Sequence, residues 1–204
     1  QFRQHPTSSK IDVSGKSPSS GISIKAKFKE GRACVFFLFG AFSATQVGDK
    51  LPAVDVHEGD PHSIVNTAEL FKGKRGILFG VPGAFTPACT KSHLPSYIEK
   101  CEELKKKGIE IIACISVNDA FVMSAWGKDQ KADGKVRMLA DPCGTFTRAL
   151  GLELDKEPLI TALGTKRCQR FVMLLEDGVV RELQVEPDGT GINCSLASHA
   201  LKLV

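Results

Sequence analysis

The hydrophobic and polar positions become regular from about residue 47 onwards, where short apolar runs alternate with amphipathic stretches. Residues 74–81 and 109–117 form two such runs, and the second is rich in β-branched side chains, which is typical of a buried parallel strand. Between them, apolar residues recur at helical spacing. This pattern predicts a helix that ends at Gly108 and whose apolar face consists of Leu94, Tyr97, Ile98, Cys101 and Leu104.

The alternation continues in the second half of the chain. Asp119 is suited to cap a helix that carries Phe121 and Trp126 on its apolar face. Asp177-Gly178 is a strong signal for a β-hairpin. Because strand–helix–strand crossovers are right-handed, the order predicts an α/β protein with a thioredoxin-like fold, in which a mixed central sheet has helices on both faces. The remaining expected elements are strands at 135–140, 170–175 and 179–185 and helices at 145–150 and 195–203.

Residues 1–46 do not share this pattern, and we interpret them as an N-terminal extension to a domain at 47–204. Residues 1–45 hold seven Lys and Arg against two acidic residues and are rich in serine, which is typical of a mitochondrial transit peptide. An apolar stretch at 33–39 also fits a secretory signal, and a cloning remnant is a third interpretation. We expect the extension to be poorly ordered and the protein to be cytoplasmic, mitochondrial or both, with secretion the weaker alternative.

Charge and cysteine usage exclude several classes of function. The net charge is +4 and residues 1–45 contribute +5 of it, so the remainder carries about −1, which argues against nucleic acid as a partner. None of the seven cysteines forms a C-x-x-C pair and there is no H-E-x-x-H, so we expect no metal site of the zinc-ribbon, c-type haem or zinc-protease kind. No apolar run reaches the ~18 residues of a membrane span, so no membrane partner is expected.

Residues 82–89 carry the strongest chemical signal, because they follow the first apolar run and lead into the predicted helix. Open α/β sheets bind their ligands at the carboxyl ends of their strands, which is where this segment begins. Cys89 falls in the first turn of the helix, where free N–H groups and the helix dipole favour a thiolate. The hydroxyl of Thr86 is placed to reach the sulfur or an oxygen bound beside it, while Pro82 and Pro87 stiffen the turn. The pattern P-x-x-x-T-x-x-C therefore predicts a reactive cysteine.

Three other interpretations of this segment are weaker. A phosphate-binding loop needs a second glycine and a G-K-[ST] ending, which are absent. A cysteine protease would use His93 as its base, yet no acid that would orient His93 is evident in the sequence. A dithiol oxidoreductase commonly has a second cysteine three residues after the first, where this chain has Ser92.

Residues 47–204 contain the segments LFGVPGAFTPAC at 78–89, SVNDAFV at 116–122, KVRMLADP at 135–142 and VEPDGTG at 185–191. In these segments the chain resembles the peroxiredoxins, and specifically their type-5, atypical two-cysteine subfamily. The resemblance implies a thioredoxin-like fold and a thiol peroxidase that reduces hydrogen peroxide, alkyl hydroperoxides and peroxynitrite, in antioxidant defence and redox signalling. It further implies thioredoxin as the reductant, no cofactor, and a monomer or weak homodimer.

The same resemblance implies roles for individual residues. Cys89 matches the peroxidatic cysteine, which becomes a sulfenic acid, and Thr86 and Pro82 match the threonine and proline of its loop. Arg170 matches the arginine that faces the sulfur. Cys194 matches the resolving cysteine, which implies an intramolecular Cys89–Cys194 disulfide in the oxidised state. No part in turnover is implied for the other cysteines, which are Cys34, Cys101, Cys114, Cys143 and Cys168.

These residue types suit the reduction of a peroxide. The thiolate attacks one oxygen while negative charge develops on the other, so a permanently cationic group beside the sulfur stabilises both the thiolate and the departing oxygen. Two alternatives stay open. If Cys194 is dispensable, the chain is a one-cysteine peroxidase that is recycled by glutathione or glutaredoxin. If the chain does not turn over peroxide at all, it is a non-enzymatic redox sensor.

Overall fold

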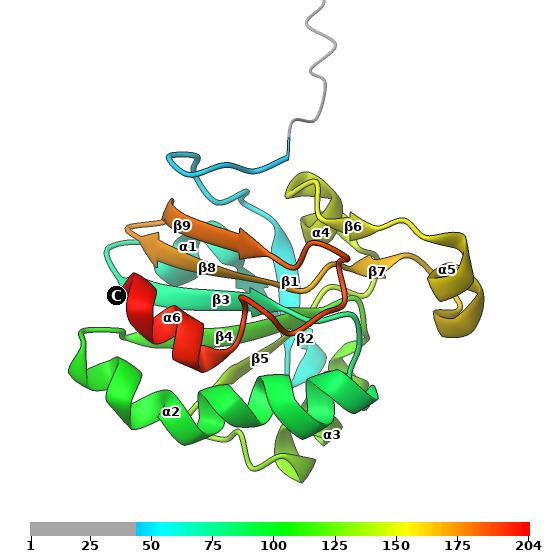
Figure 1. Cartoon of the computed structure of the whole chain (residues 1–204), viewed down its shortest axis with the longest axis horizontal. Helices are drawn as coiled ribbons and strands as arrows, with labels where there is room; N and C mark the ends of the chain where they lie inside the picture. Colours follow the sequence, from blue (N-terminus) through cyan, green and yellow to red (C-terminus); the bar gives the residue numbers. More distant parts are fainter. Residues whose placement is uncertain (1–43) are drawn as a thin grey trace, which may run out of the picture. The chain divides into compact units, whose positions relative to one another are not determined.

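The computed structural model describes residues 44–204, so the extension expected at 1–46 lies outside the described residues except for its last three. The described chain is built around a seven-stranded sheet with the order β2-β1-β5-β4-β3-β8-β9 (Figure 1). Its strands are β1 (Asp55–Glu58), β2 (Asp60–Asn66), β3 (Arg75–Gly80), β4 (Ile111–Ser116), β5 (Arg137–Ala140), β8 (Phe171–Glu176) and β9 (Val179–Val185).

Parallel and antiparallel pairs are combined in this sheet. The strands β3, β4 and β5 run parallel to one another, whereas β8 pairs antiparallel with β3 and β9 pairs antiparallel with β8. The turn between β8 and β9 has positive φ angles of 51° at Asp177 and 71° at Gly178, as two-residue hairpins of this kind require. The predicted mixed sheet and the predicted hairpin are therefore confirmed.

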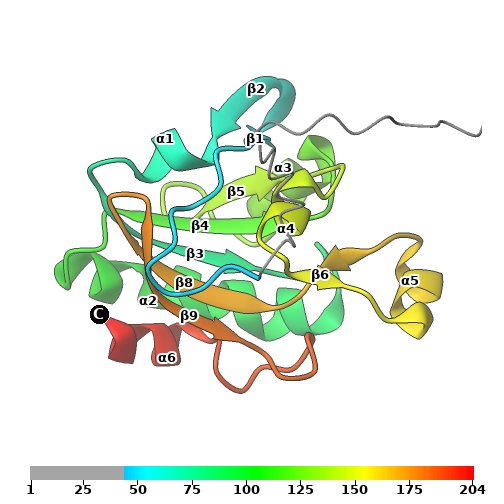
Figure 2. The ribbon, with the colours of Figure 1, turned by 90° about the horizontal axis from the view of Figure 1, so that it is seen from above.

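Helices cover both faces of the sheet (Figures 1 and 2). One face packs against α2 (Leu94–Lys106), α3 (Ala120–Asp129) and α6 (Ala197–Leu203). The other face packs against α1 (Thr67–Phe71) and α4 (Thr145–Ala149). The predicted three-layer arrangement is confirmed, with a separate apolar core on each side of the sheet. Among the helices formed by residues 44–204, none is long and apolar enough to cross a membrane.

Two segments of secondary structure were not predicted from the sequence. The hairpin of β1 and β2 was missed because β2 is mostly exposed, is largely polar and contains Pro61. The excursion formed by β6 (Glu153–Leu154), α5 (Glu157–Leu163) and β7 (Arg167–Cys168) was missed because its strands have two residues each and α5 buries none of its residues. Figure 2 shows α5 projecting away from the sheet. Neither segment leaves a periodic apolar pattern in the sequence.

Two details of the predicted helices are wrong. Phe121 is 67% exposed, because the buried face of α3 instead contains Ala120, Met123 and Trp126. The last helix begins at Ala197 rather than at residue 195. The reason is that Ser195 precedes the helix and donates both its backbone N–H and its hydroxyl to Glu186.

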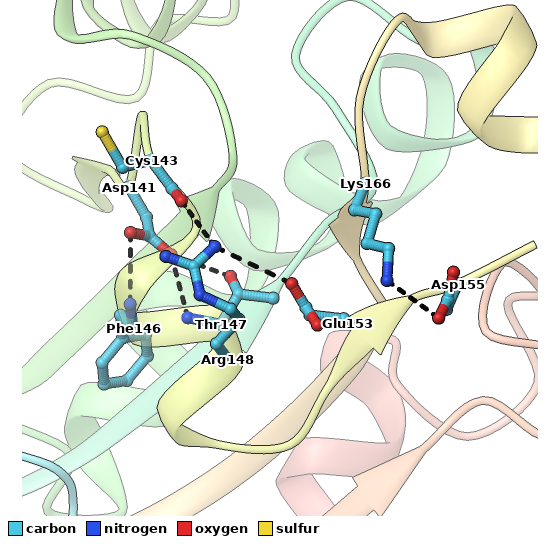
Figure 3. Close-up of polar contacts among 8 residues, drawn as sticks. All are labelled: Asp141, Cys143, Phe146, Thr147, Arg148, Glu153, Asp155 and Lys166. Carbon is cyan, nitrogen blue, oxygen red and sulfur yellow. Dashed lines mark hydrogen bonds and ion pairs between the residues drawn. The ribbon is translucent and has the colours of Figure 1, made fainter. Parts of the chain in front are cut away.

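The carboxyl end of β5 is fixed by the buried carboxylate of Asp141 (Figure 3). This carboxylate accepts hydrogen bonds from the backbone N–H groups of Phe146 and Thr147, at 3.2 and 2.9 Å, and from the Thr147 hydroxyl at 2.9 Å. These bonds satisfy N–H groups that the first turn of α4 would otherwise leave without partners. Since β3, β4 and β5 are parallel, the loops that follow them lie at one edge of the sheet.

Candidate active site

The loop between β3 and α2 begins at this edge of the sheet. Its path is held by the side chain of Asn118, whose Oδ1 accepts the backbone N–H of Ala84 at 3.0 Å. Asn118 follows β4, so the neighbouring parallel strand positions the loop. Phe85 has a positive φ of 59° and is 53% exposed. Such a φ is strained for a bulky residue, and strained backbone is often found at functional sites.

Cys89 lies in the first helical turn after this loop, because the helix starts at residue 87. From Cys89 to His93 the helix is a π-helix, η1, in which the backbone N–H of Leu94 donates to the carbonyl of Cys89. Single π-turns of this kind are rare and occur frequently at functional sites. Cys89 is fully buried and is a free thiol. Trp126 anchors this turn from α3, since its indole N–H donates to the Thr90 hydroxyl at 3.1 Å.

Arg170 is brought to Cys89 from the start of β8, 81 residues further along the chain. Its Nη1 lies 3.3 Å from the sulfur of Cys89 and its Nε donates to the carbonyl of Thr190 at 3.1 Å. The guanidinium is only 1% exposed, and its hydrogen bonds go to the sulfur and to neutral acceptors rather than to a carboxylate. The positive charge of the guanidinium is therefore not neutralised by a carboxylate and acts on the sulfur of Cys89.

His93 completes the surroundings of Arg170. Its Nδ1 lies 3.0 Å from Arg170 Nη1, and its Nε2 lies 2.9 Å from the carbonyl oxygen of Ser195. Burial and the adjacent guanidinium lower the pKa of His93 from 6.5 to about 3, so the imidazole is neutral at ordinary pH. From its sequence context alone, His93 is recognisable only as a candidate protease base. The signal for its position was its spacing of four residues from Cys89, which places both side chains on one helix face.

Thr86 and Pro82 lie in the loop that precedes the helical turn of Cys89. Thr86 donates its hydroxyl to the carbonyl of Gly83 at 2.9 Å, so in this state it stabilises the turn. Pro82 is buried at the start of the loop. We expected the Thr86 hydroxyl to reach the sulfur, and the bond to Gly83 shows that it would have to turn to do so.

Cys194 lies in the segment between β9 and α6 and is partly exposed. Its sulfur donates a weak hydrogen bond to the carbonyl of Val185 at 3.7 Å, and it is a free thiol, like Cys89. Burial, together with the nearby carboxylate of Glu186, raises the pKa of Cys194. Glu186, which was not predicted from the sequence, accepts the backbone N–H of Cys194 at 2.9 Å.

None of the remaining described cysteines is hydrogen-bonded to Cys89, Arg170 or His93. Burial raises the pKa of Cys168 to about 12 and raises the pKa of Cys114 well above its usual value, so both are neutral thiols at ordinary pH. Cys101 is buried on α2 and Cys143 is exposed, while Cys34 lies outside the described residues. Within residues 44–204, no group of three or more His, Cys, Asp or Glu residues is arranged to hold a metal ion.

A buried free cysteine at a helix start, facing a buried arginine on a thioredoxin-like sheet, is the arrangement of a redox protein. The family model for Redoxin matches residues 46–201, so the chain belongs to the redoxin family. It is 46% identical over 157 residues to "Peroxiredoxin-2E, chloroplastic" of Arabidopsis thaliana, a match that covers 75% of this chain and 67% of the relative. Within the redoxins, the chain is therefore a peroxiredoxin.

Solved structures agree with this assignment. The structure described as reduced Prx3 in complex with H2O2 from Vibrio vulnificus is 43% identical, with a TM-score of 0.71 over 78% of this chain and 98% of that one. The structure of peroxiredoxin 5 from Alvinella pompejana is 42% identical, with a TM-score of 0.69 over 78% of this chain and 97% of that one. Peroxiredoxins are thiol peroxidases, and the chain is an oxidoreductase of this class.

Proposed function

We propose that the chain reduces hydrogen peroxide, alkyl hydroperoxides and peroxynitrite with Cys89 as the peroxidatic cysteine and Cys194 as the resolving cysteine. The observation that carries this proposal is the buried guanidinium of Arg170, 3.3 Å from the sulfur of Cys89. A buried cation is costly unless an anion compensates it. Because the other acceptors of Arg170 are neutral, the thiolate of Cys89 is the anion that the site is built to hold.

In the first step, the thiolate of Cys89 attacks one oxygen of the peroxide. An S–O bond forms, the O–O bond breaks, and the departing alkoxide or hydroxide takes up a proton and leaves as an alcohol or water, whereas peroxynitrite releases nitrite. Arg170 stabilises the charge that develops on the departing oxygen, and the Thr86 hydroxyl, once turned from Gly83, donates to a peroxide oxygen. The product is a sulfenic acid on Cys89.

In the second step, the thiolate of Cys194 attacks the sulfenic sulfur, a disulfide forms and hydroxide leaves as water. Cys89 is fully buried, so the helical turn that holds it has to unwind for the two sulfurs to meet. The π-helical turn at Cys89–His93 is suited to this because its hydrogen-bonding pattern departs from that of the following α-helix. Thioredoxin then reduces the disulfide and regenerates both thiols.

The type-5 assignment is part of this proposal. It is supported by the likeness to peroxiredoxin 5 of Alvinella pompejana and by the position of Cys194 shortly before the last helix. The complex of the Vibrio vulnificus protein with H2O2 supports hydrogen peroxide as a substrate.

The decisive experiment is steady-state peroxide consumption coupled to thioredoxin, thioredoxin reductase and NADPH. We expect Cys89→Ser to abolish turnover and Cys194→Ser to abolish turnover with thioredoxin while leaving a single oxidation of Cys89. Mass spectrometry without reductant, after one equivalent of peroxide, should find an intramolecular Cys89–Cys194 link. Retained turnover in Cys89→Ser would overturn the proposal, whereas Cys194→Ser that turns over with glutaredoxin would favour a one-cysteine cycle.

We also propose that residues 1–46 include an organellar transit sequence. The support is their basic, serine-rich and acid-poor composition, together with the chloroplastic relative from Arabidopsis thaliana, which adds the plastid to the mitochondrion as a destination. Residues 1–46 fused to a fluorescent protein should enter one of these organelles, and a fusion that stays in the cytosol would contradict the proposal.

A further inference from the structure

A continuous path of buried hydrogen bonds leads from Cys89 to the segment that carries Cys194. Arg170 Nη1 lies 3.3 Å from the sulfur of Cys89 and 3.0 Å from His93 Nδ1. His93 Nε2 lies 2.9 Å from the Ser195 carbonyl. The hydroxyl of Ser195 donates to Glu186 at 2.6 Å. We call Cys89, Arg170, His93, Ser195 and Glu186 the buried path, and each of them is at most 1% exposed.

His93 can occupy this path in one protonation state only. A guanidinium donates hydrogen bonds and accepts none, so His93 Nδ1 has to be the acceptor toward Arg170. The ring proton is then on Nε2, which donates it to the Ser195 carbonyl. The ring is also packed against the rings of Phe79 and Tyr97, with centroid distances of 5.1 and 5.6 Å. The orientation of the imidazole is therefore set by the hydrogen bonds of both ring nitrogens and by the two aromatic rings packed against it. The imidazole in turn orients one N–H group of Arg170.

Glu186 fixes the other end of the path. Its Oε1 accepts the backbone N–H groups of Asn193, Cys194 and Ser195 at 2.8, 2.9 and 3.1 Å, in addition to the Ser195 hydroxyl. One carboxylate thus holds three consecutive residues, including the one whose carbonyl receives His93. Burial alone would raise the pKa of Glu186, but these hydrogen bonds outweigh it and lower the pKa to about 2, so the group is a carboxylate at neutral pH.

We propose that His93 and Glu186 are positioning residues that make the reactivity of Cys89 depend on the folded state of the Cys194 segment. Glu186 fixes the Ser195 carbonyl, that carbonyl orients His93, and His93 holds Arg170 against the sulfur. The inference rests on the proposed role of Cys89 as the reacting thiol. Its consequence is that Cys89 is fully activated only while the segment that will resolve it is in place. When Cys194 moves to form the disulfide, the same movement releases Arg170.

The sign of one substitution separates positioning from simple electrostatics. Glu186→Gln removes a negative charge from the surroundings of Cys89. By Coulomb's law alone, this favours the thiolate and lowers the pH at which Cys89 reacts. A positioning role predicts that Cys89 reacts at a higher pH instead. The neutral amide no longer holds the three N–H groups, and the contact of Arg170 with the sulfur therefore loosens.

The other ionisable groups that face this site do not change the direction in which Glu186→Gln is expected to shift the reactivity of Cys89 with pH. They are Tyr97 on α2, Cys114 on β4 and Cys168 on β7, and burial raises the pKa of each. All three are therefore neutral in the parent and stay neutral in the variant at the pH values of the measurement. Cys194, whose pKa is also raised by burial and by Glu186, is replaced by serine in every protein tested.

The experiment measures the rate at which iodoacetamide alkylates Cys89 as a function of pH, with the modified peptide quantified by mass spectrometry in a Cys194→Ser background. We expect His93→Phe and Glu186→Gln each to raise the midpoint of this profile by about one pH unit. We expect the rate of reaction with hydrogen peroxide at pH 7 to fall about tenfold in both. The double variant should resemble the single ones, because both substitutions interrupt one path.

Asp141→Asn is the matched control. The Asp141 carboxylate is also buried and holds the consecutive backbone N–H groups of Phe146 and Thr147, but it contacts neither His93 nor Arg170, so its loss should reduce stability and leave the alkylation midpoint in place. If His93→Phe does not fold, Glu186→Gln alone decides. A midpoint in Glu186→Gln that falls or stays unchanged would overturn the inference. Because alkylation needs no peroxide, that result would leave the proposed function intact, whereas a parent Cys89 that does not react with peroxide would overturn the proposed function.

Discussion

At the scale of single residues, Arg170 has the clearest physical requirement. Removing a guanidinium from water costs several kcal/mol, and its bonds to Thr190 and His93 return only part of this because both acceptors are neutral. A residue kept under this cost is expected to act on charge elsewhere, and the sulfur of Cys89 lies within its reach.

We therefore expect Arg170→Met to lower the second-order rate constant for hydrogen peroxide by about 10²–10³, the usual loss when a donor to developing negative charge is removed. The rate constant of Arg170→Lys should lie between those of the parent and Arg170→Met, because lysine retains the charge but lacks the planar set of donors. Stopped-flow oxidation of Cys89 measures both. Arg148→Met is the control, since Arg148 is half exposed and donates to the Cys143 carbonyl at 2.8 Å instead. Equal rates in Arg170→Met and the parent would exclude the electrostatic role.

His93 links the site to the stability of the fold through pH. Its pKa falls from 6.5 to about 3 on folding, so the unfolded chain binds a proton between these values that the folded chain does not. The contribution of the neutral imidazole is complete above about pH 6.5 and is lost as the pH falls toward 3. Between pH 6 and pH 4.5 this amounts to about 2 kcal/mol.

The corresponding measurement is the free energy of urea unfolding at several pH values for the parent and for His93→Phe. We expect the parent to lose about 2 kcal/mol more than the variant between pH 6 and pH 4.5, because the variant has no imidazole to protonate. Parallel curves for the two proteins would mean that His93 is protonated in the folded state.

At the scale of the elements, the unwinding of the π-helical turn η1 should change the fluorescence of a tryptophan that is bonded to it. Trp126 is the only tryptophan in the chain, and its indole N–H donates to Thr90 within this turn. If the turn unwinds when Cys89 and Cys194 join, the indole loses its partner and its fluorescence changes.

We expect two fluorescence phases after mixing with hydrogen peroxide, of which the slower one follows disulfide formation and is absent in Cys194→Ser. Thr90→Val should remove most of the amplitude of the slower phase, because the indole then has no hydrogen bond to lose when the turn unwinds. It should also destabilise the folded state by about 1–3 kcal/mol, since it leaves a buried N–H without an acceptor. A slow phase of the same amplitude in Cys194→Ser would show that unwinding does not accompany resolution.

The elements also show what the sequence could and could not predict. The strands β3 and β4 and the helix α2 were predicted, because burial against a sheet imposes a regular apolar pattern on the residues themselves. The proximity of Cys89 and Arg170 was expected only through family resemblance, since the antiparallel pairing of β3 with β8 brings them together over 81 residues. The role of Glu186 left no pattern at all, because its partners are backbone N–H groups, which every sequence contains.

At the scale of the whole molecule, one pair of facing strands positions both halves of the site. Gly80 at the end of β3 pairs with Phe171 at the start of β8. The loop that leads to Cys89 continues from Gly80, and Arg170 immediately precedes Phe171. A methyl group at Gly80 would collide with the ring of Phe171 and would approach the sulfur of Cys168 to 3.0 Å. The absence of a side chain at Gly80 therefore keeps the two strands, and with them Cys89 and Arg170, in register.

Gly76 offers a matched comparison, because it lies at the other end of β3, where a methyl group would collide with the ring of Phe71. We expect Gly80→Ala and Gly76→Ala each to destabilise the fold by about 1–3 kcal/mol, the usual cost of overpacking a core. Only Gly80→Ala should also slow the oxidation of Cys89 by peroxide under conditions where both variants are folded. Urea unfolding and stopped-flow oxidation measure the two effects separately. If both variants react as fast as the parent, the register of β3 and β8 does not control the distance between Arg170 and the sulfur, and the site owes its geometry to the buried path alone.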